Sequence, residues 1–142
     1  MRFASLMLVS LFACGGEMPS STDSGVTLPP TLTRVETELF AISCNFSACH
    51  NSGPTAMKGL ELTGKTHAKI VNVMAVEKPG AVLISPGHPE DSFLLDKMLN
   101  RNLPMAPQGE SAWTPMPYPL GGVEADRIEL LRAWIAAGAK DD

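Results

Sequence analysis

Two thiols and one imidazole meet within seven residues in the segment Cys44-Asn45-Phe46-Ser47-Ala48-Cys49-His50. Thiols this close in sequence can form a disulfide in an oxidising compartment, and a thiol beside an imidazole can take part in metal or cofactor binding. The segment therefore predicts a functional site near the start of the folded part of the chain.

The order of these residues is the order of a covalent haem site. Such a site needs two thiols for thioether bonds to the porphyrin and a histidine beside the second thiol to reach the iron. The usual spacing is C-x-x-C-H, whereas four residues separate Cys44 from Cys49. Cysteines at i and i+3 share one helical face, so the wider gap requires a looped-out turn, for which Asn45 and Ser47 are suitable.

Other chemistries remain open for the same residues. Cys44 and Cys49 could form a structural disulfide in a haem-free domain. A zinc site built from both thiols, His50 and a distant histidine is disfavoured, because adjacent cysteine and histidine ligands rarely satisfy a tetrahedral ion. A thiol oxidoreductase is also disfavoured, since its cysteine pair opens a helix after a strand, whereas this pair closes a helix.

Apolar residues at helical spacing predict an all-α domain with long irregular connections. The expected helices cover Thr31–Ser43, Thr66–Val73, Pro89–Leu99 and Glu124–Ala137. Their inward residues are expected to be Leu32, Val35, Leu39 and Ile42 in the first, Ala68, Ile70 and Val71 in the second, Phe93, Leu94 and Met98 in the third, and Ile128, Leu131, Trp134 and Ile135 in the fourth. We expect the first and last helices to pack together, with Gly138 ending the last one.

The start of the chain has the pattern of an export signal. Residues 1–13 combine Arg2 with a short apolar run, and Leu11-Phe12-Ala13-Cys14 resembles a bacterial lipobox in which Cys14 is lipidated. A simple secretory signal with a free cysteine is the alternative. Residues 14–30 are rich in Gly, Ser, Thr and Pro and predict a flexible tether, so the folded domain is expected over residues 31–142.

Composition narrows the class of partner. The formal net charge is −4, and lysines and arginines are scattered among the acids, which argues against nucleic acid as a partner. Aromatic residues are few while Met and Pro are plentiful. A small domain of this composition often depends on a cofactor or a cross-link to complete its core.

The motif, a Met-Pro turn at Met116-Pro117 and the terminal amphipathic helix together resemble a class I c-type cytochrome domain. Residues 85–93 and 133–139 are similar to small haem-c-like domains of bacterial lipoproteins. The resemblance implies one covalent haem c on Cys44 and Cys49, with His50 as proximal iron ligand. It implies Met116 as distal ligand, and Met105, in a second Pro-rigid loop, is the alternative.

The remaining histidines could in principle give a bis-histidine haem. We expect His88, between Gly87 and Pro89, to face solvent or to cap a helix, and His67, beside Lys65 and Lys69, to lie on a solvated face.

The resemblance predicts an electron carrier and not an enzyme, because His50 and Met116 would fill both axial positions of the iron. The expected partners are redox proteins, which could include a larger oxidoreductase, and a membrane reached through the lipid anchor. Gly15 follows Cys14 where Asp would indicate inner-membrane retention, so we expect an outer-membrane lipoprotein that faces the periplasm.

Overall fold

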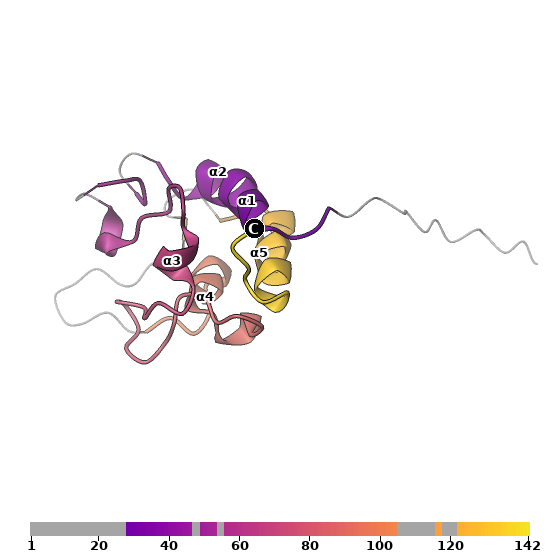
Figure 1. The fold of residues 1–142 in the computed structure, drawn as a ribbon. Coiled ribbons are helices and arrows are strands. Elements are labelled where there is room, and N and C mark those ends of the chain that lie inside the picture. Colours follow the sequence, from indigo (N-terminus) through magenta and orange to yellow (C-terminus); the bar gives the residue numbers. More distant parts are fainter. Residues whose placement is uncertain (1–27, 47–48, 54–55, 105–115, 118–121) are drawn as a thin grey trace, which may run out of the picture.

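The computed structural model describes residues 28–46, 49–53, 56–104, 116–117 and 122–142. In this part of the chain the regular elements are all helices, joined by irregular segments and a few single-residue bridges (Figure 1). The prediction of an all-α chain is confirmed at this level. The last helix, α5 (Ala125–Ala136), packs against both the first helix and α4 (Phe93–Leu99), so the expected packing of first and last helices is present.

The first helix is continuous but changes its winding. It consists of α1 (Leu32–Arg34), a π-helical segment η1 (Val35–Phe40) and α2 (Ala41–Ser43). A π-turn takes more residues than an α-turn, so each residue after it is carried back around the helix axis. Phe40 and Cys44 consequently face the core, at 0% and 8% exposure, whereas Ile42 is 49% exposed. The prediction that Ile42 faces inward is wrong for this reason.

The third expected helix is broken. Pro89–Asp91 forms a 3-10 turn, η3, and α4 begins only at Phe93 because Ser92 is extended, with φ −95° and ψ 108°. The Phe93 N–H donates to the carbonyl of Val82 at 3.0 Å, which ties this break to the segment 71–84. The predicted inward residues Phe93, Leu94 and Met98 are buried.

Two short helical pieces lie between the motif and that break. They are η2 (Met57–Gly59) and α3 (His67–Ile70). α3 is shorter than predicted because Val71 is extended and pairs with Ile84 in a single bridge. Ile70 is buried as expected, while Ala68 is exposed, contrary to the prediction.

Among the described residues, the last helix supplies the largest fully buried side chain. Trp134 is 1% exposed, and its indole N–H donates to the carbonyl of Lys140 at 2.9 Å. Gly138, at φ 99°, ends the helix as predicted: its N–H donates to Ile135, and the Ala139 N–H donates to the carbonyl of Trp134. Leu131 and Ile135 are also fully buried, and Ile128 packs against the same core.

Asp142 lies at the beginning of the first helix, where Figure 1 also places the end of the chain. Its Oδ1 accepts the Leu32 N–H at 2.9 Å, and its carbonyl accepts the Thr33 N–H at 3.0 Å. These two N–H groups have no partner within the helix, so Asp142 caps it from outside.

Replacing Asp142 by alanine is expected to lower the free energy of unfolding by about 1 kcal/mol, as for the loss of a helix N-cap. The alanine keeps the main-chain contact to Thr33 but loses the carboxylate contact to Leu32. Urea unfolding measures the change. Asp141→Ala is the matched control, with the same loss of charge, and an equal effect of the two substitutions would contradict the capping role.

Candidate functional site

The backbone closes the Cys44–His50 motif into a compact loop. Cys44 continues the first helix through its N–H bond to the carbonyl of Phe40 at 2.9 Å. The Cys49 N–H donates to Phe46 at 2.8 Å, and the His50 N–H donates to the carbonyl of Cys44 at 3.2 Å. In a helical C-x-x-C-H the histidine N–H would bond to this same carbonyl, four residues back. The wider motif therefore keeps the bond between its first cysteine and its histidine; Ser47 and Ala48, between them, lie outside the described residues.

The ring of His50 is held in one orientation. Its Nδ1 lies 2.9 Å from the carbonyl oxygen of Leu60, and its main-chain carbonyl accepts the Leu62 N–H at 2.8 Å. A carbonyl can only accept a hydrogen bond, so Nδ1 carries the proton. In a neutral ring the lone pair is then on Nε2, which is the arrangement in which a histidine binds a metal through Nε2.

The two thiols have different surroundings. Both are free, with Cys44 buried and Cys49 half-buried. Burial, with a smaller contribution from the neighbouring Cys49 thiol, raises the pKa of Cys44 to about 12. Cys44 is therefore protonated at neutral pH, which does not fit a catalytic nucleophile.

This difference predicts unequal alkylation in haem-free protein carrying Cys14→Ser. At pH 8 about one Cys44 side chain in 10⁴ is a thiolate, so iodoacetamide should label Cys49 first, and Cys44 labelling should rise about tenfold per pH unit toward pH 11. Peptide mass spectrometry after timed quenching gives both rates. In urea Cys44 should react as an ordinary thiol. Equal native rates at pH 8 would contradict its burial.

Apolar side chains lie exposed around the motif. Ile42 is 49% exposed, Phe46 44% and Met57 49%, and the Met57 N–H donates to the carbonyl of Cys49 at 2.9 Å. Ile42 lies two residues before Cys44, and Phe46 lies within the motif, so both side chains are exposed close to the two thiols in sequence. Neither Met57 nor the Leu60 carbonyl was predicted from sequence, since a main-chain acceptor leaves no signal in residue type.

Met116 is bonded to α4 through its main chain. Its N–H donates to the carbonyl of Lys97 at 3.0 Å, and its side chain is half-buried. Within the described residues it has no hydrogen bond to Cys44, Cys49 or His50. The two other predicted positions, Cys14 and Met105, lie outside the described residues. No helix in the described ranges has the length and hydrophobicity to cross a membrane.

The other two histidines are occupied elsewhere. His67 Nε2 lies 2.8 Å from the carbonyl of Ala139, so the prediction that it lies on a solvated face is wrong; it ties α3 to the segment after α5. His88 faces solvent as predicted, with Nδ1 3.3 Å from Glu90. Among the described residues, one group of three side chains has potential metal-ligand atoms within 4.8 Å of one another. It consists of His88, Glu90 and Asp91, and all three are exposed.

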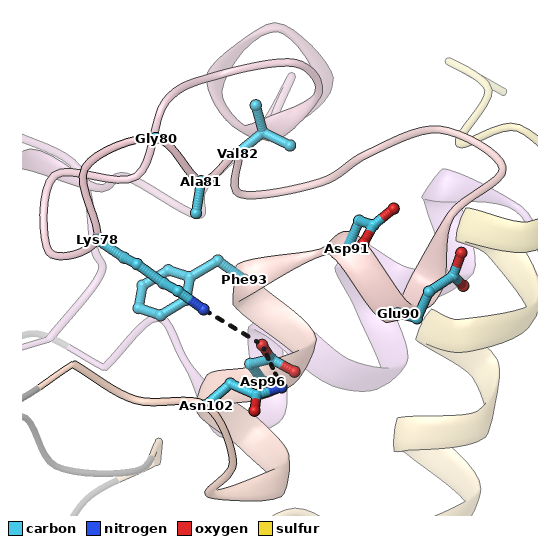
Figure 2. Close-up of a pocket in the computed structure, with 9 residues that line it drawn as sticks. All are labelled: Lys78, Gly80, Ala81, Val82, Glu90, Asp91, Phe93, Asp96 and Asn102. Carbon is cyan, nitrogen blue, oxygen red and sulfur yellow. Dashed lines mark hydrogen bonds and ion pairs between the residues drawn. The ribbon is translucent and has the colours of Figure 1, made fainter.

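A polar pocket of about 450 Å³ lies beside α4 (Figure 2). Asp96, at its base, is 4% exposed and accepts hydrogen bonds from Arg101 Nε at 2.6 Å and Asn102 Nδ2 at 3.3 Å. Lys78 lies 3.9 Å from Asp96 and 5.6 Å from the ring centre of Phe93. The residues that line this pocket include neither the motif nor Met116.

Comparison with known proteins identifies no relative: the chain matches no protein-family model, no curated protein and no solved structure.

Proposed function

We propose that the chain is a c-type cytochrome domain that transfers electrons through one covalently bound haem. Cys44 and Cys49 would hold the haem by thioether bonds, and His50 and Met116 would bind the iron. When bound, the haem would supply a one-electron redox couple. The chain's own residues need only hold it and exclude water, so no acid, base or nucleophile is required.

The orientation of His50 is the observation that carries this proposal. A metal-binding histidine almost always donates its second ring N–H to a carbonyl or carboxylate, which fixes the tautomer. The carbonyl of Leu60, 2.9 Å from Nδ1, has this role here. It leaves Nε2 as the ligand atom of a histidine that directly follows the second thiol.

The thiols and their surroundings fit the same group. Cys44 and Cys49 are both free, and the loop between them is closed by the bond from the His50 N–H to Cys44. The exposed side chains of Ile42, Phe46 and Met57 provide apolar surface beside the motif. A porphyrin bound there would cover that surface, which favours its binding by the hydrophobic effect.

Met116 is the preferred distal ligand because it stands in a Met-Pro turn ahead of the last helix, as in the cytochromes that the sequence resembles, and its N–H is bonded to the Lys97 carbonyl. Thioether ligation favours the reduced iron and raises its potential, and it needs a methionine that is held in place.

Covalent haem is tested first. The mature domain is purified from a host that matures c-type cytochromes, denatured in pyridine with dithionite, and its absorption is recorded; the Cys44→Ser, Cys49→Ser double variant is the control. Haem is expected in the first and absent from the second. A chain that carries no haem, and whose Cys44 and Cys49 do not react with a thiol reagent, would overturn the proposal and indicate a structural disulfide between these two residues.

The distal ligand is tested in the haem-loaded protein. Met116→Ala should abolish the weak near-infrared sulfur-to-iron band of the oxidised form. Met74→Ala is the matched control, since Met74 is 56% exposed. Survival of the band in Met116→Ala would transfer the assignment to Met105.

We also propose that Cys14 is lipidated and tethers the domain to the outer membrane, facing the periplasm. Cys14→Ser should move the protein from the membrane fraction to the soluble fraction. Unchanged fractionation would refute the lipid anchor without affecting the haem.

A further inference from the structure

The C-terminal turn of α4 forms main-chain hydrogen bonds to the residues that follow it and to Met116. A helix leaves its last carbonyl groups without partners. The carbonyl of Asp96 accepts the N–H groups of Asn100, which is left-handed at φ 51°, and Arg101. The next carbonyl, that of Lys97, accepts the N–H of Met116 at 3.0 Å. Asp96 and Lys97 are consecutive residues of this turn. Asp96 therefore holds the chain that leaves α4, and Lys97 holds Met116.

The side chain of Lys97 is engaged in a buried ion pair. Its Nζ lies 2.7 Å from Glu77 Oε2, and the two side chains are 7% and 12% exposed. Glu77 belongs to the segment 71–84, which is bonded to the start of α4 through Val82 and Phe93. The pair therefore links this segment to the turn of α4 on which Met116 lies.

A buried ion pair contributes little to net stability, and in some proteins its role is to fix geometry. Removing two charges from water costs nearly as much as their attraction returns, so replacing both partners by apolar residues is often neutral. In some proteins a buried charged group selects one arrangement of the chain, and this is the role considered for the Glu77–Lys97 pair. The Glu77–Lys97 pair is thus suited to set the position of the Lys97 main chain.

We propose that the Glu77–Lys97 ion pair positions Met116 as the distal iron ligand. Glu77 and Lys97 are positioning residues: they act through the Lys97 carbonyl and do not touch the iron. The inference rests on the proposed function, because it gives the ion pair a role toward the haem.

The test is the double variant Glu77→Leu, Lys97→Met in the haem-loaded protein. Removing both charges avoids a buried unpaired charge, so the variant should fold with near-normal stability. The surface pair on α5, Glu129 with Arg132 at 3.1 Å, supplies the control Glu129→Leu, Arg132→Met. Hydrogen exchange of the Met116 amide is measured by NMR in the reduced protein, and the near-infrared band in the oxidised protein.

The expected result is exchange of the Met116 amide at least about tenfold faster and a weakened near-infrared band, with both unchanged in the control. Unchanged exchange would overturn the positioning role, and so would faster exchange with an intact band. Absence of haem from the unsubstituted chain would overturn the proposed function and the ligand role together, while Met116 exchange in haem-free protein would still test whether the pair holds this segment.

Discussion

Replacing His50 by alanine is expected to convert the haem of the loaded protein from a low-spin to a high-spin absorption spectrum, while the haem stays covalently bound. Cys44 and Cys49 would still hold the porphyrin, but the imidazole that the Leu60 carbonyl orients through Nδ1 would be missing. The loss should be complete and not graded, because no other described histidine is placed to replace it: His67 bonds to Ala139 and His88 faces solvent.

Two additions make this experiment specific. Free imidazole added to His50→Ala should restore the low-spin spectrum by entering the space left by the side chain. His88→Ala is the control and should leave the spectrum unchanged. A low-spin spectrum in His50→Ala without imidazole would show that His50 is not the proximal ligand.

Replacing Trp134 by alanine is expected to lower the free energy of unfolding by about 3–5 kcal/mol, the usual cost of emptying a large buried site. Trp134 is 1% exposed in the core shared by the first and last helices, and the substitution also removes the hydrogen bond to Lys140. Most small domains have only about 5–15 kcal/mol of total stability, so this is a large share. Urea unfolding of the variant and of the unsubstituted protein, both with the same haem content, measures the loss in free energy of unfolding.

Two variants on the same helix separate the contributions. Trp134→Phe keeps most of the apolar volume and loses the hydrogen bond, so its effect should be clearly smaller. Glu129→Ala, on the exposed side of α5, should change stability by less than about 0.5 kcal/mol. A loss below about 1 kcal/mol in Trp134→Ala would contradict its place in the core.

Periodicity predicted the positions of the helices because burial follows the spacing of apolar residues. It succeeded best for the last helix, where Leu131, Trp134 and Ile135 are buried, Ile128 is partly buried against the same core, and Gly138 provides the stop. It failed at Ile42, since a hydrophobic pattern read at an α-helical period cannot detect a π-turn. It also missed the break at Ser92, whose extended conformation is imposed by Val82, ten residues earlier in the chain.

The candidate site was predictable only in its side chains. The order Cys44, Cys49, His50 is visible in sequence, as is the Met-Pro pair at Met116. The contacts that hold them are with main-chain carbonyls, those of Leu60 and Lys97. Any residue type carries such a carbonyl, so no sequence pattern announces it, and the same holds for the bond of His67 to Ala139.

The π-helical segment before the motif makes the direction of Cys44 depend on residue count and not only on residue type. Because η1 (Val35–Phe40) carries the later positions back around the axis, it holds one residue more than an α-helix that turns through the same angle, so a one-residue deletion within it is absorbed by α-helical winding and leaves the Cys44 side chain directed at the core. The winding of the first helix therefore sets the direction in which the Cys44 side chain points. An insertion between Thr31 and Cys44 has no such compensation, so it should be tolerated far less well than a one-residue deletion within η1.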